Sequence, residues 1–252
     1  MEPAAVKRLI LLASCGIVML GIIPLLSLQF PTPIETEPFA EVKPEGWQSL
    51  RKLRANPFLQ RFLPLMALWS AILAAFPPFA NIYLSRQLHI PLVQIGILFS
   101  TTQILQFFMG LLAPVILRWL GLVNGIVAMQ IFMAVALGAM DVASHGSVVI
   151  AFYLASAGTQ WMSSSGLYSL LMNESPDKDL STASAMTQFC NALAGAGATA
   201  GAGILFSRFG YPDVIAGIAA VALMTAILFR LLLGHANRRT VAQPQMPKEV
   251  LG

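Results

Sequence analysis

The sequence predicts an all-α protein that crosses a membrane many times. Hydrophobic residues make up 57% of the 252 residues and charged residues only 10%, whereas a water-exposed domain carries about 25% charged residues. The mean hydropathy of +0.74 agrees with this deficit of charge. Long apolar runs also recur along the whole chain, each close to the ~20 residues that a helix needs to cross a bilayer.

Seven of these runs are predicted to be membrane-spanning helices. Their interiors contain no Asp, Glu, Lys or His. The first is predicted to be a retained span and not a signal peptide, because it is too long and no small-residue cleavage site follows it. The predicted spans are residues 8–30, 60–84, 92–117, 121–140, 147–172, 180–206 and 212–234.

The one long connection divides the chain into four parts. Residues 1–30 hold the first span, residues 31–59 form a linker, residues 60–234 hold a block of six spans, and residues 235–252 form a tail. The linker begins rich in Pro and Glu and ends with W-Q-S-L-R-K-L-R. This second part fits either a short helix lying at the lipid headgroups or a plain polar connection.

Basic residues set the expected orientation in the membrane. With the linker in the cytoplasm, eleven Lys and Arg residues lie inside and four lie outside, as the positive-inside rule requires. We therefore expect a multi-pass protein of a bacterial inner (plasma) membrane with its C-terminus in the cytoplasm.

Polar side chains indicate which helix faces meet protein, because they are costly where they face lipid. In the block of six, the order of spans is polar, polar, apolar, then polar, polar, apolar. The polar stripes fit either the wall of a cavity or hydrogen bonding between helices. The cavity candidates are Asn81, Thr101, Gln106, Tyr153, Gln160, Ser164, Tyr168, Gln188 and Asn191.

Two adjacent prolines interrupt the span 60–84. Pro77 and Pro78 both lack an N–H group and must disturb the helix. The interruption is interpreted either as a hinge or gate of a transport site, which interrupted helices often mark, or as a simple kink.

A glycine run, G-A-G-A-T-A-G-A-G from Gly195 to Gly203, resembles a dinucleotide-binding fingerprint. We reject that interpretation because a helical polar stripe, and no strand, precedes the run. Helical counting instead places Gly195 on the cavity side, and Gly197 and Gly201 on the opposite face. This G-x-x-x-G pair is predicted to let a neighbouring helix approach closely.

Other classes of function lack the residues they need. Basic residues form no long face, so nucleic acid is not an expected partner. Cys15 and Cys190 stand alone in apolar runs, so neither a metal site nor a cofactor is expected. An intramembrane enzyme would need an activated nucleophile or a general base at membrane depth, and none is present in the predicted spans. A membrane scaffold without transport activity remains an alternative.

Two local motifs and the order of the spans resemble the C-terminal half of a major facilitator superfamily transporter. The segment G-L-L-A-P-V-I-L-R-W-L-G, residues 110–121, stands where that family repeats a cytoplasmic signature, although Pro114 replaces the Asp. The loop E-S-P-D-K-D-L-S-T-A-S-A, residues 174–185, resembles the charged turn before the eleventh helix. The resemblance implies that 8–30 is the sixth of twelve helices and that 60–234 holds the last six.

The resemblance also implies a function and a partner. The family transports small molecules by alternating access, with two halves rocking around a central site between them. The candidate wall here is neutral and partly aromatic, which favours an uncharged or amphipathic solute. Five of the six helices of the first half are missing, so we expect either a fragment or a chain completed by a separate first half or a second copy.

Overall fold

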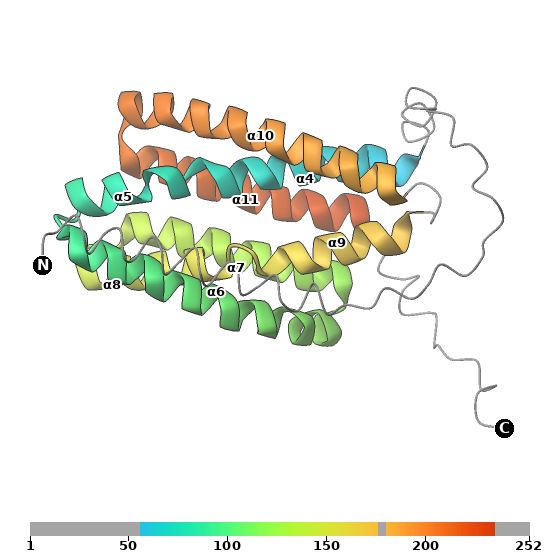
Figure 1. Cartoon of the computed structure of the whole chain (residues 1–252), viewed down its shortest axis with the longest axis horizontal. Helices are drawn as coiled ribbons and strands as arrows, with labels where there is room; N and C mark the ends of the chain where they lie inside the picture. The colour runs from blue at the N-terminus through green and yellow to red at the C-terminus, as the bar shows by residue number, and fades with distance from the viewer. Residues whose placement is uncertain (1–55, 176–179, 235–252) are drawn as a thin grey trace, which may run out of the picture. The chain divides into compact units, whose positions relative to one another are not determined.

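The computed structural model describes residues 56–175 and 180–234, and the structural statements below concern these residues. The predicted span 8–30, most of the linker, and the tail 235–252 lie outside them. Helices α4 to α11 follow one another along the chain (Figure 1). Their bounds are α4 Pro57–Ala75, α5 Pro77–Arg86, α6 Leu92–Leu120, α7 Leu122–Val142, α8 Gly146–Thr159, α9 Met162–Glu174, α10 Leu180–Phe209 and α11 Tyr211–Leu233.

The predicted fold class, an all-α multi-pass membrane protein, is confirmed. Within the described residues there is no strand, and five helical segments are long and apolar enough to cross a membrane. These segments are α4 with α5 as one unit, α6, α7, α10 and α11. Their bounds lie within a few residues of the predicted spans, because the apolar runs themselves set the helix lengths.

The predicted span 147–172 is not one continuous helix. It is divided into α8 and α9 by a turn at Gln160 and Trp161. The sequence around the turn, A-S-A-G-T-Q-W-M-S-S-S-G, is rich in residues with weak helix propensity. The Thr159 hydroxyl also donates to the carbonyls of Ala155 and Ser156 at the end of α8. Such bonds compete with regular helix formation.

The described helices repeat one pattern twice. The first pair, α4 and α5, is interrupted at Phe76, and the corresponding pair α8 and α9 is interrupted at Gln160. Each pair is followed by a long helix, α6 or α10, and then by one glycine that leads into the last helix, α7 or α11. These glycines, Gly121 and Gly210, have φ of 81° and 83°, a conformation that residues with a side chain rarely adopt. The structure therefore divides the block into the two sets of three spans that the polar pattern predicts.

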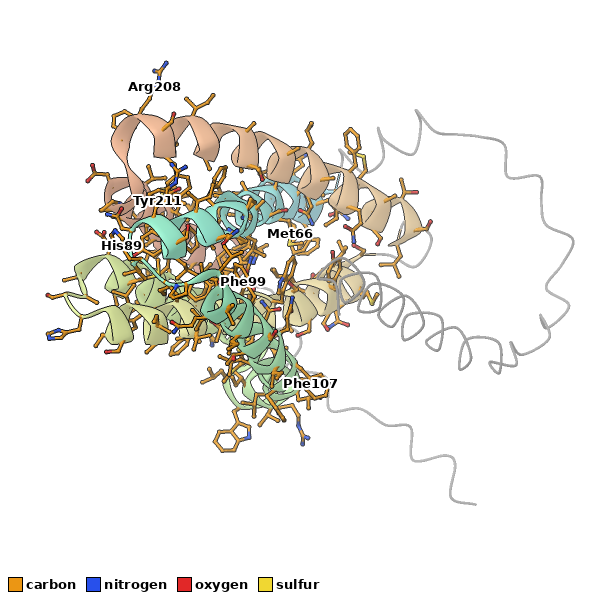
Figure 2. All side chains as sticks on the ribbon, turned by 60° about the vertical axis from the view of Figure 1, so that its left-hand side comes forward. Met66, His89, Phe99, Phe107, Arg208 and Tyr211 are labelled. Carbon is orange, nitrogen blue, oxygen red and sulfur yellow. The ribbon has the colours of Figure 1, made fainter. Side chains whose placement is uncertain are left out.

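Packing places α6 and α10 at opposite edges of the bundle (Figure 1). α10 packs mainly on α4, and α6 packs on α8, α7 and α9. α7 and α11 pack against each other and share the largest core cluster with α4 and α9. As a result α7 is the most buried span, whereas α6 and α10 are the least buried. Phe107 of α6, which is 64% exposed, and Arg208 of α10 point outward from these edges (Figure 2).

The described residues do not supply the close neighbour that the glycine run is predicted to meet. A Cβ atom added to Gly197 or Gly201 would meet nothing within 4 Å, so no described helix approaches closely there. Gly195, which helical counting assigns to a cavity, instead packs on α4, where a Cβ would lie 3.5 Å from the Ala74 Cβ atom. Helical counting finds opposite faces correctly, but it does not tell which face a neighbouring helix covers.

The closest helix approaches occur at other glycines. A Cβ added to Gly158 of α8 would lie 2.5 Å from the Leu105 Cδ2 atom of α6. One added to Gly166 of α9 would lie 2.7 Å from the Ile126 Cγ1 atom of α7. Both glycines lie in the interrupted pair α8–α9, so small residues there let this pair pack between α6 and α7.

Candidate functional site

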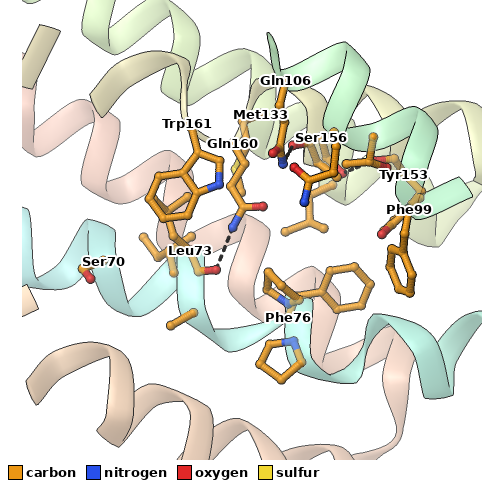
Figure 3. Close-up of a pocket in the computed structure, with 18 of the residues that line it drawn as sticks. Ser70, Leu73, Phe76, Phe99, Gln106, Met133, Tyr153, Ser156, Gln160 and Trp161 are labelled. Carbon is orange, nitrogen blue, oxygen red and sulfur yellow. Dashed lines mark hydrogen bonds between the residues drawn. The ribbon is translucent and has the colours of Figure 1, made fainter. Parts of the chain in front are cut away.

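A cavity of about 530 Å³ lies where the two interrupted helices meet. The α4–α5 junction, α6 and the α8–α9 junction supply most of its lining, and α7 and α10 complete it (Figure 3). The cavity therefore lies in the middle of the spans and not at a membrane surface. Discontinuous helices around a central cavity are a recurrent arrangement at transport sites.

The α4–α5 junction has two backbone carbonyls that the helix cannot satisfy. In a regular helix each carbonyl accepts from the N–H four residues later. Pro77 and Pro78 have no N–H, so the carbonyls of Leu73 and Ala74 lose these bonds. The interruption that the two prolines predict is thus present, as a bend at Phe76 between α4 and α5.

Side chains from two other helices satisfy these carbonyls. The Gln160 Nε2 atom donates to the Leu73 carbonyl at 2.8 Å (Figure 3). The Thr199 hydroxyl of α10 donates to the Ala74 carbonyl at 3.1 Å. Membrane helices tolerate proline where neighbouring side chains replace the lost hydrogen bonds. Gln160 also belongs to the second junction, so it links the two interruptions directly.

The α8–α9 junction has a similar arrangement. Gln106 of α6 donates from its Nε2 atom to the Ala157 carbonyl at 2.8 Å, beside the tight-turn bond from the Gln160 N–H to the same carbonyl. The second span of each set therefore donates a hydrogen bond to the interrupted first span of the other set. Gln106 does so from α6, and Thr199 does so from α10.

Aromatic rings and apolar side chains form the rest of the wall. Phe76 and Phe99 both meet the Tyr153 ring edge-on, with ring centroids 6.4 and 6.5 Å apart. Trp161 lies at the rim and is 56% exposed. No Asp, Glu, Lys, Arg or His is among the described lining residues. The part of the wall that this chain contributes is therefore uncharged, and it is mostly apolar with a few polar side chains.

The structure brings together some of the predicted cavity residues and not others. Gln106, Tyr153 and Gln160 line the cavity, and so do the two prolines of the predicted hinge. The rest of the predicted set lie outside this lining: Asn81, Thr101, Ser164, Tyr168, Gln188 and Asn191.

The side chains of three of these outlying residues form hydrogen bonds, and the Asn191 backbone carbonyl accepts from the Ser70 hydroxyl. The Thr101 hydroxyl donates to the Ile97 carbonyl of its own helix. Gln188 donates to the Tyr168 hydroxyl at 2.9 Å, which joins α10 to α9 away from the cavity. The turn at Gln160 and Trp161 explains part of the difference. It ends the regular helical count, so Ser164 and Tyr168 no longer continue the stripe of Tyr153.

Several lining residues are missing from the predicted set. They are Ser70, Phe76 and Phe99, together with smaller apolar neighbours. The polar stripes of the spans already contain Ser156 and Thr199, with Trp161 at the border, and the polar residues of the span 92–117 include Thr102 and Gln103. The two prolines predict part of this lining, because a proline inside a helix leaves the carbonyl four residues before it without its backbone hydrogen bond. The sequence could thus point to Leu73 and Ala74, but not to the side chains that reach them.

Long apolar spans, two interrupted helices and a central cavity define a polytopic membrane protein of the transporter class. The chain belongs to the Major Facilitator Superfamily, whose family model matches residues 7–199. This confirms the resemblance seen in the order of the spans.

One solved structure with a similar fold is the crystal structure of a bacterial homologue of the iron transporter ferroportin in an outward-facing state. The sequences are 19% identical and the TM-score is 0.54. The match covers 73% of this chain and 46% of that protein, so this chain spans about half the length of the transporter it matches. No curated protein sequence matches the chain.

Proposed function

We propose that this chain forms one half of a secondary active transporter that moves a small, uncharged or amphipathic solute by alternating access. The observation that supports this most is the central cavity between two interrupted helices. Family membership supports a membrane transporter in preference to an enzyme. The neutral lining and the aromatic rings favour a solute with an apolar body and no formal charge.

In this proposal the cavity residues divide between two roles. Gln106, Tyr153 and Gln160 contact the solute, because their side chains line the cavity. Pro77 and Pro78 form a hinge in the α4–α5 pair, since two consecutive positions lack the backbone bonds that stiffen a helix. The chain bends at this hinge as the two halves of the transporter rock.

A partner completes the cavity in this proposal. α6 and α10 flank it and expose large apolar side chains such as Phe107, Phe108, Phe189 and Leu193. These edges suit a first half of six helices, or a second copy of the chain, that closes the cavity from the other side. The bilayer covers the remaining apolar surface.

We do not propose iron as the solute of this chain, although the similar structure is that of a homologue of an iron transporter. Iron ions prefer carboxylate, imidazole or thiolate ligands. The described lining has none of these groups, and no group of three such side chains that could hold a metal occurs in the described part of the chain. The neutral wall supports an organic solute instead.

A cysteine at Gln103 tests alternating access without knowledge of the solute. Gln103 lines the cavity and is exposed, and the native Cys15 and Cys190 are first replaced by serine. In membranes that hold the protein with whatever completes it, we expect impermeant thiol reagents to label Gln103→Cys from either side. Labelling from only one side would contradict alternating access and favour the scaffold.

The orientation predicts a second labelling pattern. His145 lies between α7 and α8, and Asn173 lies near the end of α9, at the opposite membrane surface; both are exposed. In intact cells we expect His145→Cys to react with an impermeant reagent and Asn173→Cys to react only after permeabilisation. The reverse pattern would place the C-terminus outside.

A further inference from the structure

The serine and threonine hydroxyl groups on the cavity wall already donate hydrogen bonds to backbone carbonyls. Each lies between 2.9 and 3.1 Å from a backbone carbonyl. A carbonyl oxygen can only accept, so in each pair the hydroxyl must donate. Such a hydroxyl can then act toward a solute only as a hydrogen-bond acceptor. The four residues are Ser70, Thr102, Ser156 and Thr199.

Two glutamine side chains on the wall, one buried and one half-buried, each place the amide nitrogen against a backbone carbonyl. Gln106 and Gln160 both direct Nε2 at a backbone carbonyl, those of Ala157 and Leu73. A flipped amide would place oxygen against oxygen, so these carbonyls fix the orientation of the amides. Figure 3 shows the Gln160 oxygen on the side of its amide away from Leu73. Both carboxamide oxygens therefore remain as acceptors.

Few donors remain on the described wall. They are the second N–H of the Gln106 and Gln160 amides, the Trp161 indole and the Gln103 amide. The Tyr153 hydroxyl is already hydrogen-bonded to the Thr102 side chain. Trp161 and Gln103 are both exposed, so they lie where the cavity opens. Around the enclosed part, four hydroxyl and two carboxamide oxygens therefore remain as acceptors against two remaining amide N–H donors. The rings of Phe76 and Phe99 also line the cavity.

We propose that this wall selects solutes that combine an apolar or aromatic body with at least one O–H or N–H donor. Solutes that offer only acceptors would face oxygen lone pairs and leave them unpaired. A site that is built to bind a donor rejects an analogue without it, because its own polar groups then lose their partners. This inference rests on the proposed function, since it narrows the class of solute for the same cavity.

A matched series of compounds tests this selection. Cinnamyl alcohol and cinnamylamine have one skeleton with a donor, cinnamyl methyl ether has the skeleton with an acceptor only, and cinnamate adds a negative charge. Binding is measured by calorimetry in lipid nanodiscs that hold the chain together with the first half or second copy that completes its cavity. We expect the alcohol to bind about 2- to 10-fold more tightly than the ether, the ratio that one net hydrogen bond supplies. Cinnamylamine is a cation at neutral pH, so it should bind more weakly than the alcohol. Cinnamate should bind most weakly.

Two failures of this experiment have different meanings. Equal binding of alcohol and ether, or stronger binding of ether or cinnamate, would overturn the acceptor wall and leave the cavity as a binding site. Absence of binding by all four compounds would overturn the cavity itself, and with it the proposed function. Binding of the amine without the alcohol would show selection by charge and would also overturn the proposal.

Variants connect the selection to Gln160. Gln160→Leu removes the acceptor oxygen but also frees the Leu73 carbonyl, which is another acceptor in the same cavity. The alcohol-to-ether ratio should therefore fall most where that carbonyl is also satisfied. The same substitution is also made together with Pro77→Ala, in which the Leu73 carbonyl regains a backbone donor, so that loss of fold is not mistaken for loss of selection. Gln130→Leu is the matched control, because Gln130 is buried in α7 and does not line the cavity. An unchanged ratio in both Gln160 variants would overturn the assignment.

Discussion

Replacing Gln160 with leucine is expected to lower the free energy of unfolding by about 1–2 kcal/mol and to reduce transport. Leucine has a similar volume but cannot donate to the Leu73 carbonyl. A buried carbonyl without a partner costs about 1–3 kcal/mol, and measured hydrogen bonds between membrane helices lie at the lower end of this range. Reversible unfolding of the purified chain in mixed micelles measures the change.

The prolines supply a sharp control for this prediction. Pro77→Ala restores an N–H for the Leu73 carbonyl, so Gln160→Leu should cost almost nothing in that background. Pro78→Ala restores an N–H for the Ala74 carbonyl only. In the Pro78→Ala background, Gln160→Leu should therefore still lower the free energy of unfolding in full. Thr199→Val should lower it in the Pro77→Ala background and have almost no effect in the Pro78→Ala background.

This crossed set of double mutants measures coupling energies directly. Coupling is expected for Gln160 with Pro77 and for Thr199 with Pro78, and additivity is expected for the two crossed pairs. Gln130→Leu should cost less than Gln160→Leu, because the Gln130 amide is buried without a hydrogen-bond partner among the described residues. Additive behaviour of all four pairs would show that the side chains do not replace the lost backbone bonds.

The second large effect is expected at Gly158. Gly158→Val should destabilise the bundle by about 1–3 kcal/mol, the usual cost of adding volume to a packed interior. Its Cβ atom would lie 2.6 Å from the Leu105 Cγ atom, so α6 and α8 must separate or Leu105 must move. Because α8 and α6 form two walls of the cavity, transport should fall as well.

Gly197→Val is the matched control for this substitution. Both changes place a β-branched residue in a helix of the same bundle, so their intrinsic helix propensities change alike. A Cβ at Gly197 would meet nothing within 4 Å. Thermal unfolding in detergent should show a clearly lower midpoint for Gly158→Val than for Gly197→Val. Equal midpoints would show that the close approach of α6 and α8 contributes little to stability.

The sequence predicts the spans well because bilayer thickness acts on each helix separately. A run such as 92–117 must be apolar over its whole length whatever its neighbours are, so its bounds can be read from composition. Proline at 77 and 78 likewise acts through its own backbone. The interruption of the α4–α5 pair was therefore predictable, whereas the turn at Gln160 has no proline and was not.

The cavity depends on which helix faces meet, and one helix alone does not determine this. Helical counting placed Tyr153 and Gln160 on one face, and both line the described cavity. It also included Tyr168, which lies beyond the turn. It assigned close packing to Gly197, where an added Cβ would meet no described atom within 4 Å, and overlooked Gly158. Which helix covers each face is decided by packing between segments that are far apart in the chain.

The sequence by itself determined that this chain is a helical membrane protein with two sets of three spans and freed carbonyls before Pro77 and Pro78. These properties follow from hydrophobicity and from backbone chemistry, which are local. Only the tertiary structure decided that Gln160 and Thr199 satisfy those carbonyls. A hydrogen bond between residues 73 and 160 requires two helices to be placed side by side, and that placement depends on the packing of the whole bundle.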